Sequence, residues 1–309
     1  MSYESQMLEQ FEMPTQKAVE QALLRALLKH GGVIKEFGSG QEIVDEIASE
    51  FGLNERQRSA FLETIYRKEN RIKKALLWHR LLFRAADALA RNNLVTRPTQ
   101  TLQLTKKHEW LLTEKGFDNA LKLCKIPSAI KEFLPVKSFE VQKIVKKLTE
   151  SRRTEDYDPF DKNKKIVITT RESALRTRGF RQAIIEAYSH RCAVCGLKIN
   201  SPDSLSWEVE AAHIVSHRYK GRDDIFNGIA LCRFHHWAFD VGWFTIMDNF
   251  TIQASAQIRH VPAGFGKIEE YDFLLALTNK NHEMRFPDRS EIRPHQNAIR
   301  WHRQNIFHQ

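Results

Sequence analysis

Residues 206–240 read SWEVEAAHIVSHRYKGRDDIFNGIALCRFHHWAFD, and this stretch decides the fold of the C-terminal part of the chain. Residues 206–212 alternate apolar and polar side chains, which predicts a half-buried β-strand that delivers His213 at its end. The apolar run GIALC at 228–232 predicts a second short strand, and RFHHWAFD at 233–240 predicts a helix. The stretch therefore predicts a strand–strand–helix unit.

Three polar residues of the predicted helix point in two directions. His236 and Asp240 are four residues apart and share one face, whereas His235 is rotated by about 100° from His236. The two adjacent histidines can therefore bind different metal ions.

Three of the four cysteines have metal-ligand spacing. Cys192-Ala-Val-Cys195 and Cys232-Arg-Phe-His235 are two pairs forty residues apart, and together they form the Cys3His set of a structural Zn²⁺ site. A redox Cys-x-x-Cys motif and unmetallated core cysteines are the alternatives. Cys124 stands alone and is expected to be a small buried side chain.

His213, Asn227 and His236 are separated by 14 and 9 residues, and this spacing resembles that of the HNH nucleases of the ββα-metal type with a zinc-knuckle pair. The resemblance covers residues 171–309. It implies that His213 is the general base, that Asn227 holds His213 or the second strand in orientation, and that His236 with Asp240 binds a catalytic Mg²⁺, Mn²⁺ or similar ion. A neutral imidazole suits a base because its pKa lies near the working pH.

One position departs from the family pattern. Many members carry an acidic metal ligand directly before the base, where this chain has Ala212. The third protein ligand is then Glu210, two residues earlier, or else water or a substrate phosphate fills that place.

The N-terminal part is predicted to be mainly helical. Apolar periodicity predicts helices at 14–29, at 43–48 and over 71–92, and Asn54 with Gln57 reads as a capping box that opens another helix. The segment LVTRPTQTLQLT at 94–105, with the turn-forming Arg97-Pro98-Thr99, predicts a β-hairpin. Helices followed by a hairpin are the order of a winged helix, and residues 14–121 resemble the N-terminal winged-helix domain of Mrr-type restriction enzymes.

Winged helices commonly place one helix in the major groove and the hairpin against the backbone. The basic residues expected to contact DNA are Arg56, Arg58, Arg67, Lys68 and Arg97. The alternative is a solvated helix face, because acidic residues are interleaved with these cations.

The charge of the chain points to a polyanionic partner. Its 309 residues include 48 Lys and Arg against 38 Asp and Glu, and the pI is near 9.4. The densest surplus, eleven basic against seven acidic residues, lies at 124–165. We therefore expect an α+β chain with a winged-helix DNA-binding domain at 1–123, a basic helical connector and linker at 124–165, and an HNH endonuclease domain at 166–309.

Targeting signals are not apparent in the sequence. No apolar run approaches the roughly 18 residues of a membrane span, and the start MSYESQMLEQ lacks the basic and apolar regions of a signal peptide. We expect a cytoplasmic protein with double-stranded DNA as its partner and no membrane contact.

These features predict a metal-dependent DNA endonuclease, interpreted as a restriction enzyme whose winged helix finds a site that the HNH domain cuts. Dependence on a modified base such as methyladenine stays open. The alternatives are a zinc-stapled DNA-binding regulator with a degenerate HNH centre and a mobile-element nuclease. A homodimer is expected, because a double-strand cut needs two active sites or two sequential nicks.

Overall fold

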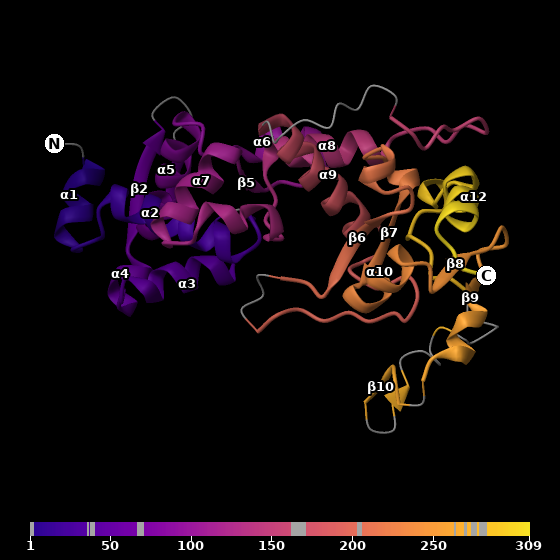
Figure 1. The fold of residues 1–309 in the computed structure, drawn as a ribbon. Helices are drawn as coiled ribbons and strands as arrows, with labels where there is room; N and C mark the ends of the chain where they lie inside the picture. The colour runs from indigo at the N-terminus through magenta and orange to yellow at the C-terminus, as the bar shows by residue number, and fades with distance from the viewer. Residues whose placement is uncertain are drawn as a thin grey trace. The chain divides into compact units, whose positions relative to one another are not determined.

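Figure 1 shows the computed structural model of the chain, which describes residues 3–35, 37, 41–66, 71–161, 171–202, 206–262, 264–268, 271–272, 277 and 283–309. The chain divides into two compact units, Met1–Gln142 and Lys143–Gln309. Both units combine helices with small sheets, which confirms the predicted mixture of helix and strand. None of the helices in the described ranges is long and apolar enough to cross a membrane.

The N-terminal unit is mainly helical. Its helices are α1 (Tyr3–Gln10), α2 (Gln16–Lys29), α3 (Glu42–Glu50), α4 (Glu55–Ser59), α5 (Leu77–Arg91), α6 (Pro98–Thr105) and α7 (Glu114–Leu123). Its strands are β1 (Val33–Ile34), β2 (Phe61–Tyr66), β3 (Arg71–Leu76), β4 (Val95–Thr96) and β5 (Trp110–Leu112). The 3-10 helix η1 (Ser128–Phe133) and α8 (Phe139–Thr149) follow, and the division between the units falls inside α8.

The core of this unit forms where α2 packs against α5 and α7. The helix predicted at 14–29 is confirmed as α2, with Val19, Leu23 and Leu27 buried on its apolar face. Trp78 at the start of α5 donates a hydrogen bond of 3.1 Å from its indole nitrogen to the carbonyl of Val44, which ties α5 to α3. Strands β1, β5 and β4 form an antiparallel sheet in that order.

The β-hairpin predicted at 94–105 is wrong. Only Val95–Thr96 is a strand, and it pairs with β5, while residues 98–105 form the helix α6. Pro98 occupies the first turn of α6, where its fixed φ favours the helix and its missing N–H costs nothing. The backbone N–H of Arg97 donates to Gln100 Oε1 at 3.1 Å, so the residues interpreted as a turn cap a helix instead.

The helix predicted over 71–92 is wrong in its first turns. Residues 71–76 form β3, which pairs antiparallel with β2, and the helix α5 begins only at Leu77. The helix predicted after Asn54 exists with its capping box but is the short α4.

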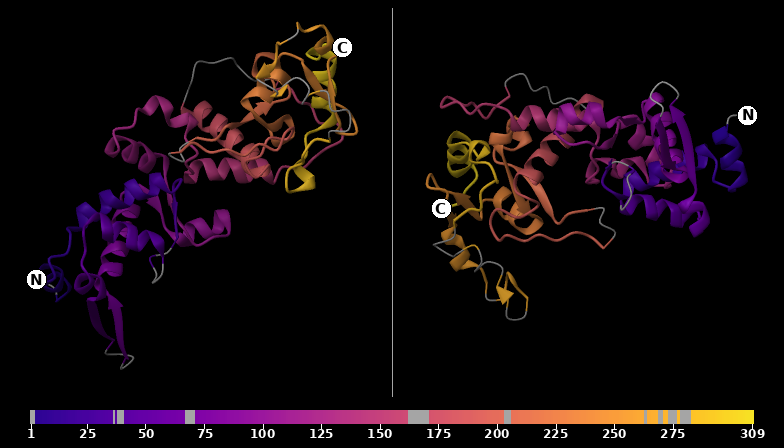
Figure 2. Two further views of the ribbon diagram at one scale, coloured as in Figure 1. Left: turned by 90° about the horizontal axis from the view of Figure 1, so that it is seen from below. Right: turned by 180° about the vertical axis from the view of Figure 1, so that it is seen from behind.

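Along β2, Leu62 is buried between the exposed Phe61 and Glu63, and Glu63 pairs with Lys74 at 2.8 Å. Figure 2 shows this hairpin extending away from the helices of its unit.

The C-terminal unit carries the strand–strand–helix stretch. Its elements are α9 (Arg171–Ala187), β6 (Val209–His213), β7 (Gly228–Cys232), α10 (Arg233–Asp240), β8 (Phe244–Ile246), β9 (Ile252–Ala254), β10 (Lys267–Ile268), β11 (Tyr271–Asp272) and α12 (Gln296–Asn305). The two predicted strands and the predicted helix are confirmed as β6, β7 and α10. The predicted basic helix of the connector is confirmed as α8, with Val141 and Val145 buried.

The antiparallel register of β6 and β7 sets His213 opposite Gly228. Helix α9 packs against both strands (Figure 1), and a side chain on Gly228 would overlap those of Ile184 and Phe180 on α9. Glycine at this position therefore lets α9 approach closely and bring Phe180 to the end of β6.

Candidate active site

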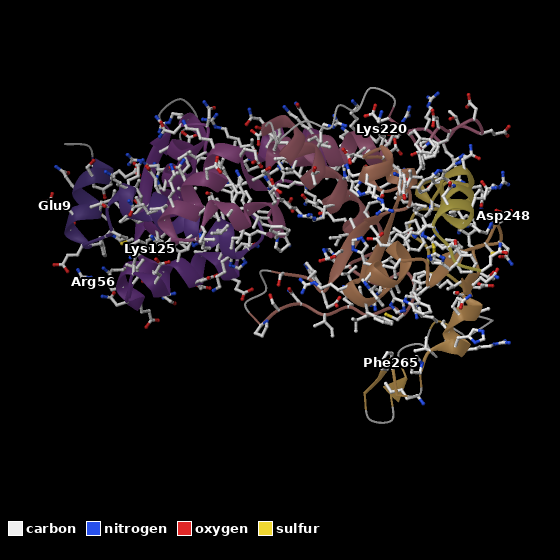
Figure 3. The ribbon with its side chains drawn as sticks, in the orientation of Figure 1. Glu9, Arg56, Lys125, Lys220, Asp248 and Phe265 are labelled. Carbon is white, nitrogen blue, oxygen red and sulfur yellow. The ribbon has the colours of Figure 1, made fainter. Side chains whose placement is uncertain are left out.

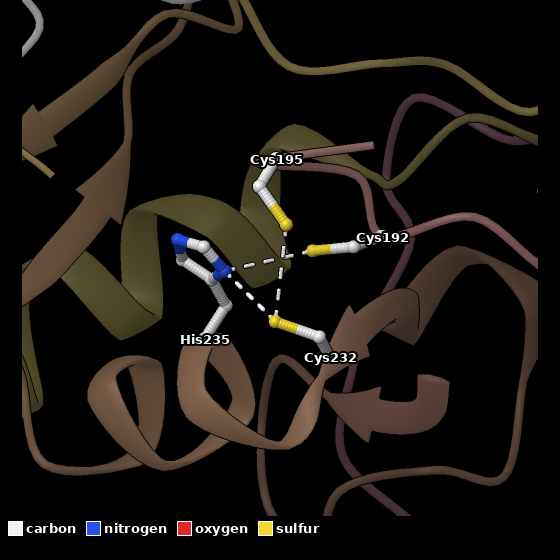
Figure 4. A group of neighbouring side chains, drawn as sticks. All are labelled: Cys192, Cys195, Cys232 and His235. Carbon is white, nitrogen blue, oxygen red and sulfur yellow. Dashed lines mark hydrogen bonds between the residues drawn. The ribbon is translucent and has the colours of Figure 1, made fainter. Parts of the chain in front are cut away.

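Cys192, Cys195, Cys232 and His235 converge on one point (Figure 4). The first two lie in the turn after α9, Cys232 ends β7, and His235 lies in the first turn of α10. His235 Nδ1 lies 3.7 Å from Cys192 Sγ and 3.0 Å from Cys232 Sγ, and Cys195 Sγ lies 3.9 Å from Cys232 Sγ.

The donor set of this cluster fits a zinc ion. Bonds of roughly 2.0–2.3 Å in a tetrahedron place neighbouring ligand atoms about 3.5–3.8 Å apart, close to most of the separations here. Without an ion the four groups share protons: hydrogen bonds from Cys195 and Cys232 lower the pKa of the Cys192 thiol, while the pKa values of Cys232 and His235 are raised. A metal ion that binds here would displace the remaining protons. All four predicted ligands therefore lie within reach of one metal ion.

His213 lies at the end of β6 with its ring stacked on Phe180, the centroids being 3.9 Å apart at an interplanar angle of 15°. Its Nε2 atom lies 3.1 Å from Asp223 Oδ1. The two contacts fix both the plane of the imidazole and the direction of one ring nitrogen.

Asp223 and His217 are site residues that the sequence reasoning missed. The Nε2 atom of His217 also lies 3.1 Å from Asp223 Oδ1, and the ligand atoms of His213, His217 and Asp223 all lie within 4.8 Å of one another. We call these three residues the His213 cluster. The other carboxylate oxygen of Asp223, Oδ2, lies 3.4 Å from the guanidinium of Arg176 on α9. The histidine and aspartate side chains between β6 and β7 were a weak indication of a site in the sequence. Only the loop conformation brings the side chains of His213, His217 and Asp223 together.

Asn227 is fully buried, and its side chain holds the loop that follows His213. Its Oδ1 accepts the backbone N–H of Val215 at 2.9 Å, and its Nδ2 donates to the carbonyls of Val215 and Arg222 at 3.0 Å each. Both ends of the loop are therefore tied to the start of β7. This arrangement orients the segment that carries His217 and Asp223.

The third predicted residue of the motif, His236, lies between two carboxylates. Its Nδ1 lies 3.0 Å from Glu210 Oε2 on β6, and its Nε2 lies 3.6 Å from Asp240 Oδ2, one turn along α10. We call these residues the His236 cluster. Because the two carboxylates face opposite ring nitrogens, Glu210 and Asp240 do not converge on one side of this imidazole.

The charges of the His236 cluster are coupled. Burial alone would lower the pKa of His236, but the hydrogen bond to Glu210 and the charge of Asp240 raise it above its ordinary value. The bond from His236 in turn lowers the pKa of Glu210. Burial raises the pKa of Asp240, and the nearby charges of His236 and Arg218 oppose that rise. Arg218 directly follows His217, so the loop of the His213 cluster runs close to Asp240.

Ala212, which holds the position of the missing acidic ligand, is fully buried. The nearest carboxylate on the same strand is Glu210, which is bonded to His236 and to Arg233. The carboxylate that contacts His213 is that of Asp223, which lies in the loop after β6 and not on the strand.

The predicted DNA-contacting residues of the N-terminal unit lie in different settings. Arg56 is exposed on α4 (Figure 3), with its guanidinium 5.4 Å from the ring centroid of Phe11. Arg58 donates to Leu53 and Asp45, and Arg97 donates twice to Asp87 Oδ1, at 2.9 and 2.8 Å. Arg67 and Lys68 lie outside the described residues.

Comparison with known proteins supports the family resemblance of the C-terminal unit. Residues 192–247 match the family model described as HNH endonuclease, which confirms the predicted resemblance over that range. The matched residues include both metal-ligand pairs, His213, Asn227 and the whole of α10.

A solved structure described as "Modification dependent TagI restriction endonuclease" is similar to part of the chain. The identity is 21%, the likeness covers 45% of this chain and 44% of that chain, and the TM-score is 0.32. The likeness thus spans less than half of either chain. No curated protein matches the chain.

Proposed function

We propose that this chain is a metal-dependent DNA endonuclease that hydrolyses phosphodiester bonds. The observation that carries the proposal is the ordered imidazole of His213, held by Phe180 and Asp223 at the end of β6 in a unit whose helix α10 offers His236 and Asp240. The match of residues 192–247 to the HNH endonuclease family supports phosphodiester hydrolysis as the reaction of this site.

Each residue has a distinct role in this proposal. His213 takes a proton from the attacking water, and Asp223 orients the ring and stabilises the imidazolium that forms. His236 Nε2 and Asp240 would hold a divalent ion such as Mg²⁺ or Mn²⁺, with water or a substrate phosphate in the remaining places. Such an ion neutralises charge that develops on the phosphate.

Glu210 acts on His236 from the opposite ring nitrogen. A carboxylate that accepts the second N–H of a metal-binding histidine fixes its tautomer and orientation. The 3.0 Å separation between Glu210 and Nδ1 supports this positioning role rather than direct ligation. The residue before His213, the buried Ala212, takes no part.

We also propose that the N-terminal unit is a winged-helix DNA reader. Its sheet order β1-β5-β4, with α2 before β1 and with α3 and α5 between β1 and β4 in the chain, supports this assignment. The segment β4–α6–β5 would then be the wing. In this proposal the reader spans residues 1–123, the connector 124–165 and the nuclease 166–309.

A restriction role fits a chain that joins a DNA reader to a nuclease. Whether the enzyme cleaves modified or unmodified DNA is tested as follows. One plasmid is prepared from a methylating host and from a methylation-free host, and cleavage is measured with Mg²⁺, Mn²⁺ or EDTA. We expect cleavage that needs the ion and stops in EDTA. Cleavage of the modified plasmid alone would identify a modification-dependent enzyme.

The matched variants are His213→Ala and His260→Ala. The first should cleave on the order of 10²–10⁴-fold more slowly and keep its affinity for DNA. The second removes an exposed histidine at the end of η4 (Ala256–His260) and should cleave normally. DNA binding without cleavage under any ion would contradict the nuclease proposal and favour a DNA-binding regulator, with Ala212 as the reason.

A further inference from the structure

A pocket of about 330 Å³ lies beside the turn that carries Cys192 and Cys195, which we call the metal-ligand turn. Three cationic side chains line it, those of Arg191, Lys198 and Arg285. The remaining lining residues are Tyr188, Ser189, Phe286 and Asp288. The proposed nuclease chemistry uses none of these groups.

The pocket has an excess of positive charge. Its one acidic residue, Asp288, accepts a hydrogen bond of 2.7 Å from the hydroxyl of Ser189. Across the described ranges of the chain, Arg191, Lys198 and Arg285 form no ion pair with a carboxylate. Three like charges around one small pocket repel one another, so an anion between them is favoured.

The metal-ligand turn, from Cys192 to Cys195, holds Arg285 in place. Arg285 donates its backbone N–H to the carbonyl of Ala193 at 2.8 Å, and its guanidinium packs so closely on Gly196 that a Cβ there would lie 2.6 Å from Nε. The Nζ atom of Lys198 lies 5.8 Å from the ring centroid of Trp207. Arg285 is therefore anchored to the metal-ligand turn, while the exposed Arg191 and Lys198 line the pocket from the surface.

Aromatic and cationic contacts fix Phe286, another residue of the pocket lining. Phe286 packs edge-on against Phe250, with the ring centroids 5.2 Å apart. The guanidinium of Arg293 lies 4.0 Å from the centroid of the Phe286 ring. Tyr188 is buried, and burial raises the pKa of its hydroxyl, so this residue stays neutral. Among the lining residues, Asp288 alone carries a charge that disfavours an anion.

We propose that this pocket binds a phosphate group of the DNA substrate, outside the site of cleavage. Arginine presents a planar fork of donors that matches phosphate oxygens, and lysine adds a point charge. Contacts of this kind position a protein on the duplex without reading its sequence. The inference rests on the proposed function for the source of the phosphate, because inorganic phosphate or a free nucleotide offers the same chemistry.

The test uses the full chain in EDTA, so that binding is measured without cleavage. Arg191→Gln/Lys198→Gln is compared with Arg259→Gln/Lys267→Gln, which removes the same charges at exposed positions elsewhere in the unit. Equal melting temperature and metal content between the variants establish that both are folded. Binding of a labelled duplex is then titrated over a series of salt concentrations.

The pocket variant should bind duplex DNA about five- to tenfold more weakly at physiological salt. Its plot of log affinity against log salt concentration should be shallower by about one unit, the effect of one lost phosphate contact. The control pair should keep the slope of the wild type. A pocket variant with the slope and affinity of the wild type overturns the proposal.

A second arm measures binding of inorganic phosphate and of a nucleoside monophosphate by calorimetry. Binding of these small anions that the pocket substitutions abolish, with duplex affinity unchanged, would assign the pocket to a free phosphorylated ligand and overturn its assignment to DNA. Salt-dependent DNA binding by a wild type that never cleaves would contradict the nuclease function alone and leave the pocket as proposed.

Discussion

The carboxylate oxygen Oδ1 of Asp223 lies 3.1 Å from Nε2 of His213, although the two residues are on different segments of the chain. The same oxygen lies 3.1 Å from His217 Nε2, so one acidic side chain serves two imidazoles. Asp223 is nearly buried, which strengthens its interaction with a positive charge on either ring. In the proposed mechanism, this contact orients the base before the reaction begins.

Replacing Asp223 tests this relationship. Asp223→Asn keeps the shape of the side chain and removes its charge, so we expect single-turnover cleavage to slow about 10–100-fold while DNA affinity stays unchanged. The pH dependence of the rate should shift as well, because the charge that favours the imidazolium is gone.

The matched control is Asp248→Asn, an exposed carboxylate paired with Arg300 and Arg303. It should cleave at the rate of the wild type. If Asp223→Asn cleaves at that same rate with the same pH profile, Asp223 has no positioning role.

Loss of a cysteine ligand should unfold the C-terminal unit. Cys192→Ser should abolish tight binding of one metal ion and lower the free energy of unfolding by at least about 4 kcal/mol, since metal binding and folding are coupled at such sites. Metal content by mass spectrometry and thermal melting provide the measurements. Cys124→Ser, at a half-buried cysteine of the other unit, should change neither. Full metal content in Cys192→Ser would refute the assignment of this ligand.

Removal of the Asn227 amide should be costly for stability. Asn227→Ala leaves one buried backbone N–H and two carbonyl groups without their partner, so we expect a loss of about 2–4 kcal/mol in urea unfolding. Asn305→Ala, at an exposed position of α12, should cost under about 0.5 kcal/mol. Equal stability of the two variants would show that the loop does not depend on Asn227.

Stability should depend on pH through His302. This histidine is buried: its Nε2–H donates to the carbonyl of Phe239 at 3.0 Å, and its Nδ1 accepts from the Thr245 hydroxyl at 3.1 Å. The centroid of its ring lies 3.6 Å from that of the Phe239 ring, on which it stacks. Burial lowers its pKa from 6.5 to about 4. Since the unfolded chain takes up this proton first, stability should fall as the pH drops from about 6.5 to 4, by on the order of 3 kcal/mol.

The measurement is urea unfolding of the wild type and of His302→Phe across this pH range. The variant loses two hydrogen bonds and should be less stable at pH 7, but its stability should decline less steeply toward pH 4. Parallel curves for the two proteins would mean that His302 does not carry this dependence.

The sequence determined the parts of this protein that depend on neighbours along the chain. The alternation before His213, the apolar run of β7 and the spacing of the two cysteine pairs are local patterns, and the structure confirms the elements and the converging ligands that they predicted. A four-residue separation on one helix likewise placed His236 beside Asp240. These inferences succeed because strand and helix periods fix side-chain direction over a few residues.

Tertiary structure decided what depends on distant residues. The signals around Arg97-Pro98-Thr99 suit a turn and a helix start equally, and only the pairing of β4 with β5 selects the helix α6. Asp223 reaches His213 because Asn227 ties down the loop between them, a contact that leaves no periodic trace in the sequence. Loop conformation is set by long-range packing and hydrogen bonds, so the partner of the candidate base emerges only when the chain is folded.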